Sequence, residues 1–123
     1  MNNEEKVWNI LEKLGLTVTV YNNIHADAVT VNNQILVSGR IINSPEFVYV
    51  MAHEIAHYIL HTDHRCNSIK NEAEANRWAI TFLTTDVHHI RSYVEFMQIN
   101  GIPGKLLDMV QDVLTPIMLS RVE

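Results

Sequence analysis

The sequence is poor in several features, and each shortage excludes a class of protein. It has one cysteine, Cys66, so no internal disulfide framework can form and a reducing compartment is expected. No apolar run approaches the roughly 18 residues of a membrane span, and the N-terminus lacks a basic region followed by an apolar run. The sequence therefore predicts a soluble, cytoplasmic protein without a membrane segment.

Basic residues are also few. The chain has 9 lysines and arginines and 14 acidic residues, which gives a formal net charge of -5. The basic residues form no stripe along the sequence, so direct nucleic-acid binding is not expected. Internal repeats and Pro/Gly/Ser-rich linkers are absent. With 47% hydrophobic residues, a chain of 123 residues can bury one core, so residues 1–123 are predicted to form a single domain.

Apolar periodicity predicts helices separated by β-branched runs. The expected helices cover residues 3–14, 47–61, 69–83, 87–99 and 105–118, and the expected strands cover 17–21, 28–31 and 35–38. Asparagine pairs between the strands indicate tight turns, and residues 29–37 look like a hairpin. The predicted fold class is α+β, with a small antiparallel three-stranded sheet packed against a helical core. An exposed edge strand of that sheet could pair with an extended peptide.

The most informative stretch is FVYVMAHEIAHYILH, residues 47–61, which contains the pattern HExxH. In a helix, side chains four residues apart lie one above the other, about 6 Å apart, so His53 and His57 can reach one metal ion. Glu54 falls on the flank of the same face, where it could act as a general base on water without ligating the metal. The pattern indicates a zinc-peptidase site.

A third ligand is needed, because catalytic zinc generally takes three protein ligands and leaves one position for water. The following helix, residues 69–83, carries Glu72 and Glu74. Glu72 shares a face with Ala75 and Ala79, which must pack inward, whereas Glu74 points the opposite way. An inward carboxylate needs a partner, and zinc is a sufficient one. Glu72 is therefore the predicted third ligand, although the same donors accept other divalent ions.

Other polar residues have two readings each. Asn76, one turn beyond the predicted third ligand, could either hydrogen-bond a ligand histidine and fix its tautomer or form a simple bond between helices. His88, His89 and Tyr93 are candidates to stabilise the transition state, because peptidases need a hydrogen-bond donor there. Each of these three also fits an ordinary residue on a helix surface.

The motif HEIAHYILH followed by NEAEANRWAITFL resembles the ImmA/IrrE family of small zinc metallopeptidases over residues 45–83. In that family, the HExxH helix is followed by a helix of the form E-A-E-A-N-x-F-A. The resemblance implies a minimal gluzincin-like fold in which His53, His57 and Glu72 bind zinc and Glu54 is the base. It also implies the cleavage of helix-turn-helix repressors in phage or other mobile elements and in stress responses.

The residues and the resemblance together predict a zinc-dependent endopeptidase that cleaves a regulatory protein. Glu54 would take a proton from water and pass it to the leaving amine. Two alternatives from other classes stay open. The chain could be a non-catalytic binding module that keeps zinc for structure and acts on a repressor without cutting it. It could also be a toxin-like or inhibitory partner in a two-gene module.

Overall fold

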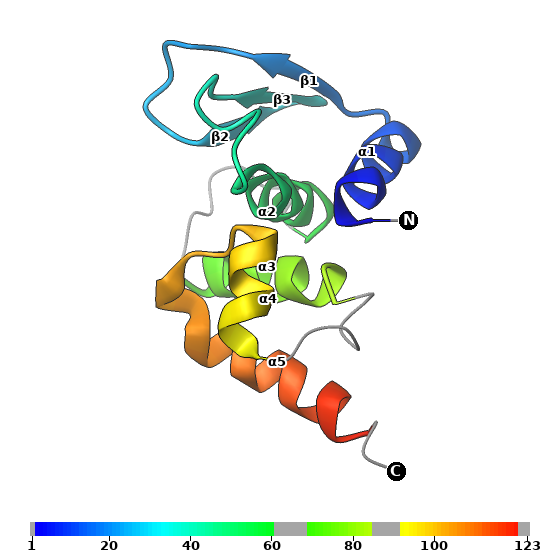
Figure 1. The fold of residues 1–123 in the computed structure, drawn as a ribbon. Coiled ribbons are helices and arrows are strands. Elements are labelled where there is room, and N and C mark those ends of the chain that lie inside the picture. Colours follow the sequence, from blue (N-terminus) through cyan, green and yellow to red (C-terminus); the bar gives the residue numbers. More distant parts are fainter. Residues whose placement is uncertain (1, 61–68, 85–91, 121–123) are drawn as a thin grey trace.

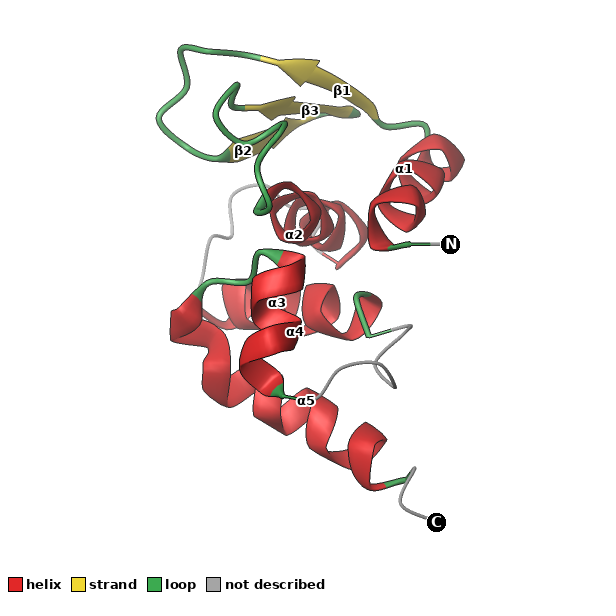
Figure 2. Ribbon diagram, viewed as in Figure 1, coloured by secondary structure: helices red, strands yellow, loops and turns green. Residues whose placement is uncertain are grey.

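The computed structural model describes residues 2–60, 69–84 and 92–120, which adopt an α+β fold (Figure 2). In chain order the elements are α1 (Asn3–Leu14), β1 (Thr17–Val20), β2 (Ala28–Val31), β3 (Gln34–Val37), α2 (Phe47–Leu60), α3 (Ile69–Phe82), α4 (Tyr93–Asn100), the 3-10 turn η2 (Gly104–Leu106) and α5 (Leu107–Leu119). Most of these elements lie where apolar periodicity and β-branched runs predict them. Among the described residues, no helix has the length and apolar content to cross a membrane.

The sheet is mixed, so the prediction of a purely antiparallel sheet is wrong. β2 and β3 form the predicted antiparallel hairpin, and Asn32 in its turn has a left-handed φ of 56°. β3 then lies in the centre and pairs in parallel with β1, with Thr17 opposite Gln34. The connection over residues 21–27 carries the chain past this central position before the hairpin returns to fill it. Both β1 and β2 are therefore edge strands.

Helix α2 lies in the middle of the molecule, between the sheet and the C-terminal helices (Figure 1). Toward the sheet and α1, it buries Met51 and Ile55 in one apolar cluster. Toward α3, α4 and α5, it buries Tyr49 and Ala52 in another. Because both sides are packed, only a narrow strip of α2 remains for polar groups.

The N-terminal helix α1 closes one side of the cluster around the sheet. Asn2 caps it by accepting a hydrogen bond from the backbone N–H of Glu5 at 2.8 Å. Gly15 ends it in the left-handed conformation, with a φ of 71°, which glycine adopts without strain. Between these ends, Val7 and Leu11 are buried. The helix thus covers α2 and the sheet, and its Lys6 also reaches the end of α3, where it donates a hydrogen bond to the carbonyl oxygen of Phe82.

The C-terminal part differs from the prediction at one helix start. α4 begins at Tyr93, where Ser92 caps it by accepting a hydrogen bond from the N–H of Glu95 at 3.0 Å. The predicted start at residue 87 lies outside the described residues. Residue 92 has extended backbone, so the helix of the structure does not continue backward through it. A capping serine therefore sets this boundary better than the apolar spacing does.

Candidate metal centre

The HExxH motif occupies the strip of α2 that packing leaves free. Ala52 and Ile55 have no solvent exposure, because they face the two apolar clusters, and Ala56 is fully buried as well. The side chains of His53 and His57 each keep 20% of their surface exposed, and both face α3. The helical period thus separates the residues that pack from those that can bind a ligand.

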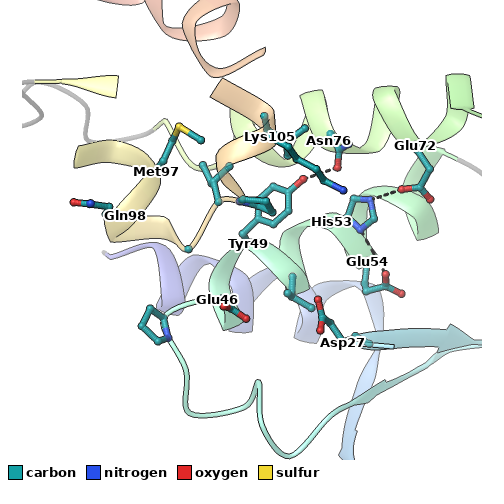
Figure 3. Close-up of a pocket in the computed structure, with 17 residues that line it drawn as sticks. Asp27, Glu46, Tyr49, His53, Glu54, Glu72, Asn76, Met97, Gln98 and Lys105 are labelled. Atoms are coloured by element: carbon teal, nitrogen blue, oxygen red, sulfur yellow. Dashed lines mark hydrogen bonds and ion pairs between the residues drawn. The ribbon is translucent and has the colours of Figure 1, made fainter. Parts of the chain in front are cut away.

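Helix α3 brings a carboxylate to this strip. Ala75 and Ala79 are fully buried, and Ala79 shares an apolar cluster with Tyr49 and Ala52 of α2. Small side chains on this face let the two helices approach closely. Glu72 lies on the same face of α3 and points to the histidines (Figure 3). Glu74 lies on the other side, where its Oε1 is 3.9 Å from Nζ of the exposed Lys70. Of the two glutamates weighed as a third ligand, the structure brings only Glu72 to the HExxH strip.

The carboxylate of Glu72 bridges the two imidazoles. Its Oε2 lies 3.0 Å from Nε2 of His53, and its Oε1 lies 3.0 Å from Nε2 of His57. The two rings stand nearly perpendicular, at 82°, with centroids 4.7 Å apart. One donor atom from each of the three residues lies within 4.8 Å of the others.

These donors fit a metal ion. In a tetrahedral zinc site with ligands at about 2.1 Å, neighbouring donor atoms lie about 3.4 Å apart, so small shifts of the side chains suffice. Two imidazole nitrogens and one carboxylate oxygen form the donor set of many catalytic zinc sites. The cluster of His53, His57 and Glu72 could therefore hold a metal, and its chemistry suits zinc.

The electrostatics of the cluster favour a positive charge. Burial lowers the pKa of the His53 imidazole, but hydrogen bonds and charge from Glu54 and Glu72 outweigh burial. The pKa of His53 is consequently raised above its usual value. A bound metal cation would be stabilised by the same two carboxylates, in place of a proton on His53.

Glu54 faces the same space but does not join the three donors. Its Oε1 accepts a hydrogen bond of 2.8 Å from the hydroxyl of Thr30 on β2. Its Oε2 lies 3.7 Å from Nδ1 of His53, and only 13% of the side chain is exposed. A sheet residue therefore holds this carboxylate beside the cluster, in a place suited to a general base.

Tyr49 and Asn76 form a second polar contact between α2 and α3. The Tyr49 hydroxyl donates a hydrogen bond to Oδ1 of Asn76, and the Tyr49 ring stacks on His53 with centroids 6.0 Å apart. Burial, followed by the charge of Glu72, raises the pKa of Tyr49, so the hydroxyl keeps its proton. Of the two roles considered for Asn76, the bond between helices is the one seen in the structure.

Tyr93, considered as a transition-state stabiliser, lies away from the cluster. Its hydroxyl is 2.7 Å from Oγ1 of Thr115 on α5, and it does not border the cavity beside the metal cluster. His88 and His89 lie outside the described residues.

A cavity of about 640 Å³ extends beside the donors (Figure 3). Its floor is α2, one wall comes from the start of β2, and the opposite wall comes from α4 and the turn that follows it. Asp27 stands at the β2 side and is paired with Arg40 at 2.6 Å. Lys105 stands at the opposite wall. The cavity thus separates the sheet from the C-terminal helices directly at the HExxH motif.

Three residues of this site escaped sequence reasoning. Tyr49 could have been found, because it precedes His53 by four residues and so lies on the same face of α2. Thr30 gives a weaker signal, as a polar residue between two valines of a strand. Lys105 gives none, since it lies more than 30 residues after Glu72 and follows a turn.

Comparison with known proteins agrees with the geometry. A family model described as the IrrE N-terminal-like domain, a peptidase, matches residues 10–98. The match includes the sheet, α2 and α3, and it stops within α4, before the turn that carries Lys105. Searches of curated proteins and of solved structures gave no match.

Proposed function

The chain belongs to the IrrE N-terminal-like domain family of peptidases, and from this premise we propose that it is a zinc-dependent endopeptidase. The observation that carries the proposal is the meeting of His53, His57 and Glu72 beside an open cavity. A separate carboxylate, Glu54, faces the same cavity without entering the donor set. Metal-dependent hydrolysis of a peptide bond uses one set of residues to hold the metal and a separate residue as the general base.

The three donors would hold the metal, and Glu54 would move the proton. When bound, zinc acts as a Lewis acid toward the attacking water and the scissile carbonyl. Glu54 takes a proton from that water onto its carboxylate while the water oxygen attacks the carbonyl carbon. It then delivers the proton to the leaving amine as the C–N bond breaks. Thr30 keeps the carboxylate turned to the cavity during both transfers.

The substrate we propose is a segment of a protein in extended conformation. β2 is an edge strand and borders the cavity through Ala28, so an extended peptide can add to it through backbone hydrogen bonds. The resemblance to ImmA/IrrE peptidases favours a helix-turn-helix repressor of a mobile element or stress response as that protein. We place the reaction in the cytoplasm, because the chain has only one cysteine.

Substitution of Glu54 tests the proposal most directly. Zinc-loaded wild-type protein, incubated with a helix-turn-helix repressor encoded beside it, should release discrete fragments. Glu54→Gln should retain zinc and lose cleavage by at least about a hundredfold, because the amide cannot accept the proton. Glu74→Gln on the far face of α3 is the matched control and should cleave like wild type. Fragments by mass spectrometry and zinc by elemental analysis give both readouts.

The same experiment separates the competing functions. A Glu54→Gln variant that cleaves normally would remove this residue from the mechanism. Zinc-loaded protein that binds the repressor tightly and never cuts it would instead favour the non-catalytic binding module. The inhibitory partner of a two-gene module would bind the neighbouring gene product and cut neither it nor a repressor.

A further inference from the structure

One wall of the cavity carries a positively charged side chain, Lys105, which belongs neither to the metal cluster nor to the general base. Among the described residues that line the cavity, Lys105 is the only lysine or arginine. The carboxylates on the other walls are Asp27, Glu46, Glu54 and Glu72. Figure 3 shows the Lys105 side chain extending across Tyr49, with its amino group directed toward His53.

The backbone that carries Lys105 is held tightly against the start of α2. α4 ends at Gly101, whose φ of 67° is left-handed, and the N–H of Ile102 bonds to the carbonyl of Met97 at 2.9 Å. A Cβ on Gly101 would clash with the carbonyl oxygen of Pro45 and lie 2.5 Å from Cα of Glu46. Only glycine permits this close approach.

The next residues complete the turn. Ile102 is buried, with 6% of its surface exposed, and the N–H of Leu106 bonds to the carbonyl of Pro103 at 3.0 Å. Lys105 therefore begins from a fixed point at the edge of the cavity, although its long side chain can still adjust to a substrate. The turn lies beyond the part of the chain that matches the family model.

Hydrolysis of a peptide bond is faster when a hydrogen-bond donor lies beside the scissile carbonyl oxygen. When water attacks the scissile carbonyl, negative charge develops on the carbonyl oxygen, and a placed donor commonly accelerates the reaction by about 100-fold to 1000-fold. The Tyr49 hydroxyl lines the cavity but already donates to Asn76. An ammonium group carries three N–H donors and a full charge, so its bond to an oxyanion is roughly twice as strong as a neutral one.

We propose that Lys105 is a catalytic residue that donates a hydrogen bond to the oxyanion developing on the scissile carbonyl oxygen. The proposal rests on the peptidase function proposed above. In this role Lys105 donates a hydrogen bond and transfers no proton, so the proton balance between water, Glu54 and the leaving amine is unchanged. The donor is then supplied by the turn after α4, on the wall opposite the sheet.

Kinetics of Lys105→Met and Lys105→Arg test this role. The probe is the peptide that wild-type protein cleaves best among fluorogenic peptides of varied charge. We expect Lys105→Met to lower kcat about 100-fold with KM changed less than about threefold, and Lys105→Arg to restore much of kcat. Lys13→Met, at the exposed end of α1, is the matched control and should behave like wild type. Zinc content and melting temperature should be equal in all four proteins.

A binding measurement gives a second readout that does not depend on turnover. Phosphinic tripeptides carry a tetrahedral anion in place of the scissile amide, and their affinity for the zinc-loaded proteins can be measured by calorimetry. Lys105→Met should weaken their binding by about the factor lost in kcat/KM, since both report the bond to the oxyanion.

The kinetic and the binding results can each overturn this role of Lys105. An increase in KM at unchanged kcat, seen only for peptides with an acidic side chain or a free C-terminal carboxylate, would show that Lys105 binds a substrate carboxylate and would overturn the proposal. Equal phosphinate affinity in Lys105→Met and wild type would overturn it as well. A wild-type protein that binds zinc and phosphinate but cleaves nothing would contradict the peptidase function, while the phosphinate comparison would still decide the role of Lys105.

Discussion

Thr30 contacts Glu54 at a single carboxylate oxygen. The 2.8 Å bond to Oε1 limits rotation of the carboxylate, whose Oε2 lies on the His53 side. A threonine hydroxyl is short and neutral, so it orients the carboxylate without cancelling its charge. A general base needs both properties, because it must be in place and still be able to accept a proton.

Replacing this hydroxyl with a methyl group should slow the reaction and leave the metal site intact. Thr30→Val keeps the branched shape that suits a strand but removes the donor to Glu54. Since a hydrogen bond to a charged group contributes about 1.5–3 kcal/mol, we expect kcat to fall about ten- to a hundredfold. Steady-state kinetics and zinc analysis check this, with Thr17→Val on the exposed side of β1 as the control. Unchanged kcat in Thr30→Val would show that Glu54 is positioned by other contacts.

The packing of α3 on α2 positions the metal ligands relative to one another. α2 carries the histidines, but α3 decides where Glu72 lies, and the two helices meet through the small residues Ala75 and Ala79. The bond between Tyr49 and Asn76 lies one turn from the metal cluster on both helices, so it helps to set their relative position along the axis. A shift of one helix along the other would separate Glu72 from the imidazoles.

In the turn after α4, adding a single methyl group at Gly101 should lower both the stability and the activity of the protein. Gly101→Ala adds a Cβ that clashes with Pro45 and Glu46 and places alanine at a φ of 67°. The backbone strain alone should lower the free energy of unfolding by about 1–3 kcal/mol, and the clash should lower it further. Displacement of Lys105 should also lower kcat.

Denaturant unfolding and steady-state kinetics measure these effects. Gly104→Ala is the matched control, since a Cβ there meets no atom within 4 Å, and its backbone is not left-handed. The variant Gly104→Ala should therefore unfold within about 1 kcal/mol of wild type. If Gly101→Ala were as stable as Gly104→Ala, the close contact between the turn and α2 would not exist in solution.

At the scale of the whole molecule, α2 joins two apolar clusters, one around the sheet and α1 and the other among the C-terminal helices. Val48 and Phe82 pack against both clusters. This continuous packing supports the prediction of a single domain, which stays a prediction. The cavity lies where the sheet and the C-terminal helices separate over α2, so a substrate would contact both halves at once.

Metal binding should therefore stabilise the entire described fold, because its donors come from two helices. With free zinc about 100-fold above its Kd, binding contributes about 2.7 kcal/mol, and the melting temperature should rise by about 10 °C over chelator-treated protein. Differential scanning calorimetry measures this shift. Glu72→Ala should lose most of it, whereas Glu74→Ala should retain it. Loss of the shift in both variants, or its absence in wild type, would contradict the assigned donor set.

The sequence by itself determined those features that follow from local periodicity. The HExxH spacing places two imidazoles on one face of any helix, and the alanines of residues 69–83 indicate which face packs inward. Glu72 shares that face, so its direction could be predicted from one helix alone. The hairpin between β2 and β3 follows likewise from two β-branched runs joined by asparagines.

Only the tertiary structure decided the contacts between segments far apart in the chain. The order of the sheet depends on where the hairpin returns, so the parallel pairing of β1 with β3 has no local signal. In β2, Val29 and Val31 are exposed, and Thr30 turns inward to Glu54, the reverse of what apolar alternation alone suggests. Lys105 likewise reaches the cavity through the packing of a distant turn on α2. The apolar periodicity of a segment determines which of its faces is buried. Which other segment covers that face depends on how the whole chain packs.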